Sequence, residues 1–402
     1  MGKDNRLLSD EELRNNALAF IAISDRSRCA NRESFSRALA SNKGYRFSSS
    51  GVYEYTSELL RHLDSVIRRS VDLIGSTLLD EQTVEAGLWR VVDKQLVGAD
   101  AFKEFVAEIY GDLNVDYRYV MPNHQIRFEE GLTQLKIGPV GAVLGDVIAS
   151  EINQGKKNPN WRVEVRHDDP PSSDGVRIAG IDAVCWEVQV RASEGSVENE
   201  AIWMVDIALS LLRLLYPPSQ QTGYFPGYDQ VECKTGTRPT IRSRNLLLSD
   251  DGISFGGWGL PPHYLITRPV AAIFDSEETK EIATALFQPP EKSVAERVAR
   301  GLGWLTRGRQ AHDKAERYLY FFTALETLLT LEGAAIVGTI ARHVSVLLMK
   351  APSDRFRASD EVKKAYGIRS RLVHEGKRNV SWYKGDTSKS SLRQLIGESL
   401  RM

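Results

Sequence analysis

The pair Pro289-Pro290 divides this 402-residue chain into two parts of different character. Proline has no backbone N–H and its ring clashes with a preceding turn, so the pair ends the helix expected over residues 277–287. The part before the pair mixes helical and strand-like patterns, whereas the part after it shows helical periodicity throughout. The sequence therefore predicts an α+β region over residues 1–290 and an all-helical region over residues 291–402.

Hydrophobic periodicity locates the expected elements. In the first part it predicts helices at 9–23, 52–78, 99–110, the end of 137–152, 202–215 and 277–287. Alternation at period two predicts strands at 161–167 and 181–191, and short strand-like pieces separated by Gly and Pro run from residue 217 to 274. The second part is expected to form helices at 292–305, 313–331, 337–349, 360–375 and 390–400. A further boundary near residue 130 is expected between an initial helical segment and the mixed segment.

The balance of basic and acidic residues also changes at the Pro289-Pro290 pair. Residues 291–402 contain 21 Lys and Arg against 12 Asp and Glu, whereas residues 1–290 contain 31 against 41. A basic region favours a polyanionic partner such as a nucleic acid, although a solvated basic surface gives the same count. One hypothesis is that the acidic part covers the basic part until a trigger separates them.

Several protein classes are disfavoured by composition. There is no run of about 18 apolar residues, so no membrane-spanning helix is expected, and the polar N-terminus lacks the apolar core of a signal peptide. The three cysteines, Cys29, Cys185 and Cys233, have neither metal-ligand spacing nor a disulfide pattern. These features favour a cytoplasmic protein that needs no cofactor or metal.

An arginine and a histidine are together sufficient to cleave RNA without a metal, because the arginine binds the phosphate and the histidine transfers a proton. We therefore searched for an arginine followed five residues later by a histidine. The spacing occurs three times: Arg162/His167, Arg307/His312 and Arg369/His374. The first pair lies in a strand pattern, where positions five apart point to opposite faces. The second lies in a Gly-rich and polar connection expected over residues 306–312. Only the third lies on a helical pattern, and Gly376 after it indicates a helix end.

Helix geometry places a condition on the third pair. Five residues turn through about 500°, so Arg369 and His374 lie about 140° apart with a rise of about 7.5 Å. They face one phosphate only if the helix breaks between them or the long arginine wraps round it. The helix dipole favours a protonated His374, whereas the neighbouring basic residues oppose it.

The C-terminal part resembles the HEPN superfamily, within it the Apea-like branch, over about the last 110 residues. Three features match in order: the aromatic-rich helix at 317–329 with its Ala-Leu-Glu sequence, a following helix, and the Arg-to-His sequence at 369–374 followed by Gly376. The resemblance implies a helical bundle that forms a homodimer. It also implies a metal-independent endoribonuclease, a nuclease and hydrolase of the kind found in bacterial antiviral defence.

The resemblance assigns roles to individual residues. Arg369 and His374 become the catalytic pair, which cuts RNA by attack of the 2′-OH. Many relatives have Asn, Asp or His directly after the arginine; here the residue is Ser370, which hydrogen-bonds but is a poor acid or base. Glu326 either orients an arginine or backbone group or belongs to the site. Arg371, Lys377 and Arg378 are candidate RNA-binding residues.

Other functions remain open from the sequence. The alternative to a nuclease is that the helical part is a non-catalytic HEPN module. Such a module binds RNA or a nucleotide as a partner in a defence complex. Asp174, Glu187 and Gln189 loosely resemble the acidic core of a metal-dependent nuclease, with Gln where Lys is usual. For the main reading, the partners are RNA (tRNA and mRNA are candidates) and a phage or cellular trigger acting on residues 1–290, and no membrane is involved.

Overall fold

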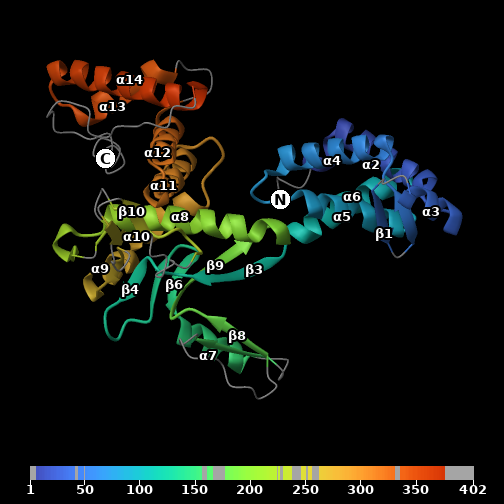
Figure 1. The fold of residues 1–402 in the computed structure, drawn as a ribbon, viewed down its shortest axis with the longest axis horizontal. Coiled ribbons are helices and arrows are strands. Elements are labelled where there is room, and N and C mark those ends of the chain that lie inside the picture. The colour runs from blue at the N-terminus through green and yellow to red at the C-terminus, as the bar shows by residue number, and fades with distance from the viewer. Residues whose placement is uncertain are drawn as a thin grey trace. The chain divides into compact units, whose positions relative to one another are not determined.

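A computed structural model describes residues 6–40, 44–48, 50–155, 161–165, 177–223, 225–226, 230–237, 246–249, 252–255, 262–330 and 336–375. The chain is an α+β protein that is mostly helical, with small sheets and a helical C-terminal region (Figure 1). The helices are α1 (Arg6–Ser9), α2 (Glu11–Ser24), α3 (Arg32–Ala40), α4 (Ser57–Ile74), α5 (Glu81–Asp93), α6 (Gly98–Leu113), α7 (Gly145–Gln154), α8 (Val197–Leu215), α9 (Arg268–Asp275), α10 (Glu277–Phe287), α11 (Val294–Gln310), α12 (Lys314–Leu329), α13 (Ile336–Leu348) and α14 (Pro352–Glu375).

The strands are short and belong to several small sheets. They are β1 (Tyr45–Ser48), β2 (Gly51–Glu54), β3 (Asp116–Pro122), β4 (Ile126–Phe128), β5 (Gln134–Ile137), β6 (Val140–Leu144), β7 (Trp161–Val165), β8 (Arg177–Ile181), β9 (Val184–Arg191), β10 (Leu246–Ser249), β11 (Gly252–Phe255) and β12 (Tyr264–Ile266). The largest sheet has four strands in the order β3-β9-β6-β5, and the others are two-stranded.

The described chain forms two compact units. Unit 1 comprises residues 1–119 and 189–201, and unit 2 comprises residues 120–188 and 202–402. The chain therefore passes between them within β3, within β9 and within α8. The division expected after residue 290, with a further boundary near residue 130, stays a prediction.

Unit 1 is built from helices with well-defined starts. Asp10 caps α2 by accepting from the backbone N–H of Leu13 at 2.8 Å, and Asp80 caps α5 through Thr83 at 2.9 Å. Apolar faces of α2, α4, α5 and α6 then share one core around the fully buried Trp89. The Trp89 ring lies 5.2 Å from Phe20.

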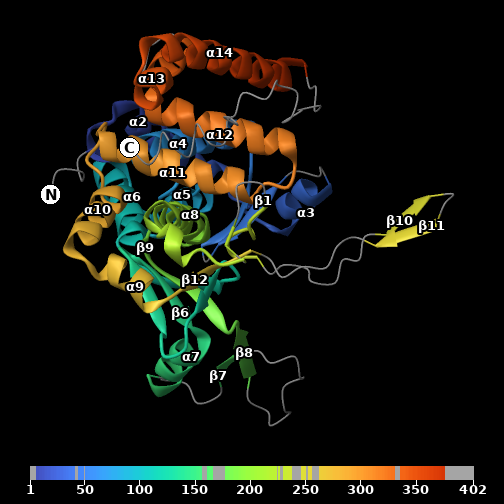
Figure 2. The same cartoon turned by 90° about the vertical axis from the view of Figure 1, so that its left-hand side faces the viewer.

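Unit 2 contains β5, β6 and most of β9, together with helices. β6 pairs antiparallel with both β5 and β9, and the central strand β9 buries Trp186 and Val188. β7 and β8 form a separate parallel pair beside α7 (Figure 2). The Asn153 side chain of α7 donates to the carbonyl of Val163 in β7 and accepts from its N–H. β4 pairs in parallel with β12.

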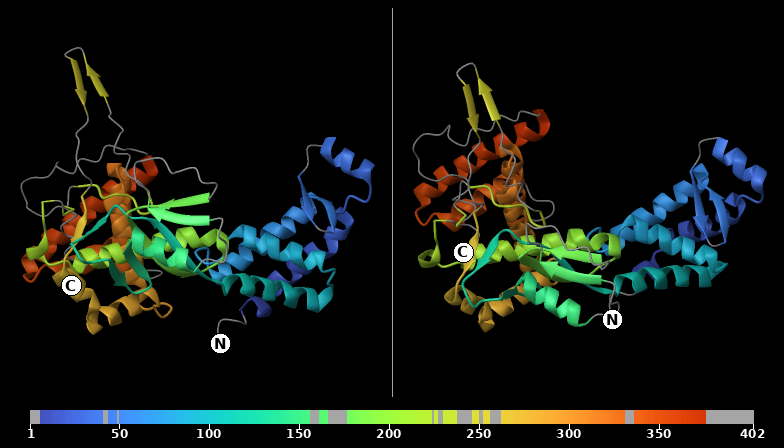
Figure 3. Two further views of the ribbon diagram at one scale, coloured as in Figure 1. Left: turned by 90° about the horizontal axis from the view of Figure 1, so that it is seen from below. Right: turned by 60° about the horizontal axis from the view of Figure 1, so that its bottom comes forward.

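The C-terminal helices form a layered bundle in unit 2. α11 and α12 lie along one another (Figure 2), and α13 and α14, the red helices of Figure 3, form the next pair. Phe321, Phe322, Ile340, Val344 and Val362 belong to their shared core. Asp313 caps α12 through two backbone N–H groups.

Several predicted elements agree with the structure, and others were wrong. The helices expected at 9–23, 99–110, 202–215, 277–287, 313–331 and 337–349 are confirmed, as is the strand at 161–167 over its described part. The helix expected over 52–78 begins only at Ser57, because the preceding residues pair in the β1–β2 hairpin. Residues 268–275, expected among strand-like pieces, form α9, which Thr267 caps. The helix expected at 390–400 lies outside the described residues.

None of the helices in the described ranges combines the length and apolar character needed to cross a membrane.

Candidate functional site

The predicted site residues lie on two helices of the C-terminal bundle. Arg369, Ser370 and His374 belong to α14, and Glu326 belongs to α12. α14 is anchored to the bundle by its buried residues Ala358, Val362 and Leu372. Tyr318 on α12 also donates to the carbonyl of Ala365 at 2.7 Å, which fixes α14 against α12 near the site.

Arg369 is held from two sides. Its Nη2 lies 3.5 Å from Oε2 of Glu326, and its guanidinium carbon lies 5.5 Å from the ring centroid of Tyr366. The Tyr366 ring in turn meets Phe322 edge-on at 5.8 Å, so it is itself fixed by the core. The structure thus brings together two predicted residues that are 43 positions apart in the sequence.

The two oxygens of the Glu326 carboxylate differ in their hydrogen bonding. Its side chain is 20% exposed, and Oε1 is buried with no hydrogen-bond partner among the described residues. Burial raises the pKa of the Tyr366 hydroxyl, and the negative charge of Glu326 raises that pKa further. Tyr366 therefore interacts with the same carboxylate that contacts Arg369, and Glu326 links these two side chains of α14.

His374 and Arg369 do not converge within one chain. α14 runs without a break from Pro352 to Glu375, so the helix end that would let both side chains face one phosphate is not found between them. Their directions from the helix axis differ by about 140°. His374 is exposed in the last turn, and its ring has no hydrogen bond or ion pair within the described part of the chain.

Two of the remaining predicted residues, Ser370 and Arg371, also belong to α14. Ser370 is partly buried, and Arg371 is exposed on the same helix. The positive charge of Arg371 acts on the buried Tyr318 hydroxyl, whose pKa burial raises. Lys377 and Arg378 lie outside the described residues.

The second arginine–histidine pair, Arg307/His312, differs in secondary structure from the prediction. The connection expected over 306–312 is instead helical as far as Gln310, because α11 continues along α12. A Cβ on Gly308 would lie 2.5 Å from the Phe321 ring, which explains why glycine occurs there. Arg307 lies over the rings of Trp203 and Trp304, 4.7 and 5.1 Å from their centroids, and pairs with Asp206 at 3.4 Å. It therefore has a structural role.

A buried ionic network in unit 2 was not anticipated from the sequence. Glu232 accepts from Arg213 at 2.7 Å, from Arg309 at 2.7 Å and from the Tyr264 hydroxyl at 3.0 Å. Burial alone would raise the pKa of Glu232, but the two guanidinium groups outweigh it and lower that pKa. The network ties the segment around residue 232 to α8 and α11. A lone arginine in the apolar sequence of α8 was the available signal, because a charge in a buried helix needs a partner.

A second buried acid supports the same region. Asp206 on α8 accepts from the Thr235 hydroxyl at 2.8 Å. Burial raises the pKa of Asp206 to about 6, although Thr235 and Arg307 act in the opposite direction. The side chains of Asp206 and Glu232 are each only 1% exposed, so a substrate does not reach them in this conformation.

The described residues contain no group of three or more His, Cys, Asp or Glu side chains placed to hold a metal ion. Glu187 and Gln189 lie on β9, whereas Asp174 falls outside the described residues. Comparisons of the chain with protein-family models, with curated proteins and with solved structures found no match.

Proposed function

We propose that the C-terminal helices cleave RNA without a metal, using Arg369 and His374. The observation that carries the proposal is the setting of Arg369. Its guanidinium is held by Glu326 and Tyr366, while His374 is exposed about 1.4 turns further along α14. The resemblance to HEPN ribonucleases, and the excess of basic residues after residue 290, agree with an RNA substrate.

Arg369 stabilises charge on the phosphate in this mechanism. A planar guanidinium donates two parallel hydrogen bonds to phosphoryl oxygens, which suits it better than an ammonium group. Glu326 and Tyr366 limit the motion of the side chain, so less conformational entropy is lost when it contacts the phosphate. Its side chain is 26% exposed and is therefore accessible from solvent.

The uninterrupted α14 leads to a two-copy arrangement. Arg369 and His374 of one chain point away from each other, so a cleft formed by two chains joins Arg369 of one copy to His374 of the other. A two-fold axis creates such shared sites from a single motif. The homodimer implied by the family resemblance supplies that axis.

The reaction follows from these positions. A neutral His374 accepts the proton of the RNA 2′-OH, and O2′ attacks the adjacent phosphorus atom. The bond from phosphorus to the 5′ oxygen breaks, and that oxygen takes the proton back from the protonated His374, directly or through a water molecule. The products are a 2′,3′-cyclic phosphate and a 5′-hydroxyl, and DNA is not cut because it lacks the 2′-OH.

A non-catalytic RNA-binding or nucleotide-binding module is the second candidate. The observation that favours it is the continuous helix α14, which keeps Arg369 and His374 apart within one chain. Arg369 is also engaged by Glu326. In that case the basic residues of the bundle hold RNA, and the chain acts as a partner in a larger complex. A cleavage assay separates the two functions, since binding survives without product.

The cellular role is proposed from the same resemblance. A ribonuclease of this kind serves bacterial antiviral defence in the cytoplasm, with tRNA or mRNA as its target. Residues 1–290 then sense a phage or cellular trigger.

The test is RNA cleavage by the purified full chain, with and without EDTA. We expect cleavage that survives EDTA and that Arg369→Ala and His374→Ala each lower by at least about 100-fold. Two matched controls are Arg357→Ala, a mostly exposed arginine on the same helix, and His312→Ala, an exposed histidine of the second Arg-x4-His pair; both retain activity. Equal activity of Arg369→Ala and Arg357→Ala contradicts the assignment.

A further inference from the structure

Unit 1 contains a cavity of about 610 Å³. It lies between α2, the β1–β2 hairpin and the turn that joins α5 to α6. This volume is in the range of small-molecule sites, which span about 300–1,000 Å³. The residues that line it are Leu18, Ile21, Ala22, Ser24, Asp25, Arg28, Ser50, Tyr53, Val92, Gln95, Leu96, Val97 and Gly98.

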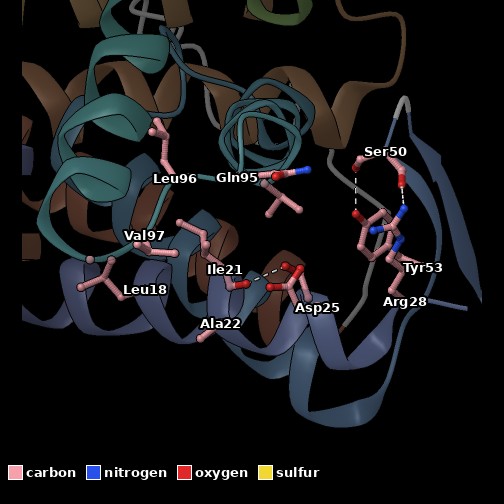
Figure 4. Close-up of a pocket in the computed structure, with 13 residues that line it drawn as sticks. Leu18, Ile21, Ala22, Asp25, Arg28, Ser50, Tyr53, Gln95, Leu96 and Val97 are labelled. Atoms are coloured by element: carbon pink, nitrogen blue, oxygen red, sulfur yellow. Dashed lines mark hydrogen bonds between the residues drawn. The ribbon is translucent and has the colours of Figure 1, made fainter. Parts of the chain in front are cut away.

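One side of the cavity is apolar. Leu18, Ile21 and Ala22 come from α2, and Leu96 and Val97 face them from the turn after α5, as Figure 4 shows. Val97 is 79% exposed, so its side chain is open to a ligand from solvent. This side suits an aliphatic or aromatic group of a ligand.

The other side carries two opposite charges. Asp25 and Arg28 are three residues apart where α2 ends, and both are exposed. Within the described residues, neither forms an ion pair, with the other or with any third group, and the Asp25 carboxylate accepts no side-chain hydrogen bond. Arg28 donates through Nη2 to the carbonyl of Ser50, an uncharged partner. A carboxylate and a guanidinium that are not ion-paired within the described residues therefore line one cavity.

Neighbouring groups fix this polar side. Ser50 donates to Asp93 at 2.5 Å and contacts the Tyr53 hydroxyl at 2.8 Å, so the hairpin is braced where Arg28 binds it. Gln95, in the turn across the cavity, adopts a left-handed backbone conformation with φ of 54°, which is uncommon for a residue other than glycine. Its amide lies toward the polar side in Figure 4 and offers both a donor and an acceptor.

We propose that this cavity binds a zwitterion with an apolar side chain, namely an α-amino acid or a short peptide. The ligand ammonium pairs with Asp25, the ligand carboxylate pairs with Arg28, and the apolar side chain lies against Leu18 and Val97. Each charge of the ligand then compensates one charge of the cavity. A free amino acid and a dipeptide share this chemistry and differ in the distance between their charges. The site is independent of the proposed RNA cleavage.

Isothermal titration calorimetry on the full chain tests the proposal. The probes are L-leucine, leucyl-leucine, N-acetyl-L-leucine, L-leucinamide and glycine. We expect saturable binding of leucine or leucyl-leucine, and the better of the two identifies the source. N-acetyl-leucine lacks the ammonium, leucinamide lacks the carboxylate and glycine lacks the apolar side chain, so each is expected to bind at least about tenfold more weakly.

Variants connect the binding to the named residues. Asp25→Asn is expected to weaken zwitterion binding at least about tenfold, whereas Asp25→Glu and Arg28→Lys, which keep the charges, retain more of it. Asp64→Asn on α4 is the matched control, because Asp64 is an exposed acid outside the cavity, and it leaves the affinity unchanged. Thermal unfolding of each variant verifies folding.

Three outcomes overturn the proposal: no binding heat at about 10 mM of either zwitterion, equal affinity for N-acetyl-leucine and leucine, or wild-type affinity in folded Asp25→Asn. Should Asp25→Asn fail to fold, the comparison of leucine with N-acetyl-leucine on the wild-type chain decides the matter alone.

Discussion

The contact between Glu326 and Arg369 gives a prediction that separates positioning from stability. Replacing Glu326 with alanine removes a 3.5 Å ion pair whose side chains are 20% and 26% exposed. Partly exposed pairs of this kind contribute about 0.2–1 kcal/mol to the free energy of unfolding. The same change also removes the buried Oε1, which has no partner among the described residues and whose burial is unfavourable. The two effects oppose each other, so the net change in stability is expected to stay within about 1 kcal/mol.

Activity is expected to respond much more than stability. Without Glu326 the Arg369 guanidinium keeps only the Tyr366 ring as a fixed neighbour, and a small misplacement of a phosphate-binding group costs about 10- to 100-fold in rate. Glu326→Gln keeps an oxygen that accepts from Arg369 and is expected to remain within about threefold of the wild type. Single-turnover cleavage of a labelled RNA measures the rate, and a filter-binding assay measures the RNA affinity, which is expected to change less than about threefold.

Two results would contradict a positioning role for Glu326. A folded Glu326→Ala protein that cleaves as fast as the wild type shows that Glu326 does not position Arg369 for catalysis. Equal losses in Glu326→Ala and Glu326→Gln show that the charge of Glu326, and not its contact with Arg369, is what matters.

Three further predictions concern stability and pH. Gly308→Ala places a Cβ 2.5 Å from the Phe321 ring and is expected to lower the free energy of unfolding by about 1–3 kcal/mol, whereas Gly367→Ala on α14, with open space at its Cβ, raises it by about 0.5–1 kcal/mol; urea titration measures both. Burial raises the pKa of Glu200 to about 7 from its ordinary value of 4.5, so Glu200 favours folding below pH 4.5 and this contribution is lost as the pH rises through 7. Glu200→Gln is therefore expected to gain on the order of 3 kcal/mol over the wild type at pH 8 but little at pH 4, and thermal unfolding at both pH values measures this; an equal difference at both contradicts it. Arg213→Met leaves Glu232 with one guanidinium partner in a buried site and is expected to cost about 3–5 kcal/mol, as judged by chemical unfolding.

Strong local signals made part of the fold predictable from the sequence. The long apolar run of α8, the periodic α6 and the periodic α12 with its Asp313 cap carry their helical signal within themselves. The β1–β2 hairpin did not, because Val52 to Glu54 extend the apolar period of α4 while their pairing depends on Tyr45 to Ser48. The first turns of α14, before Asp360, are largely polar and offer little amphipathic pattern, so their helical state was missed.

The site was predictable only where it is local. Arg369 and His374 are visible as a spacing, and Glu326 is visible as a carboxylate on an aromatic-rich helix. The buried network of Glu232 joins side chains 19 and 77 positions apart, and no sequence period links such distances. The cavity of unit 1 is assembled from α2, the hairpin and the turn after α5, so it exists only once those segments are folded together.

We propose above that two copies of the chain share one metal-independent site. The most direct measurement is cleavage of RNA in EDTA by a mixture of the Arg369→Ala and His374→Ala proteins, compared with each protein alone. We expect each variant alone to be inactive, whereas the mixture forms clefts that carry an intact Arg369 and an intact His374 from different copies. Cleavage by the mixture then exceeds that of either variant by at least about tenfold and leaves 2′,3′-cyclic phosphate ends. A mixture that stays as inactive as its components contradicts the shared site. A wild-type chain that leaves RNA intact contradicts the proposed cleavage.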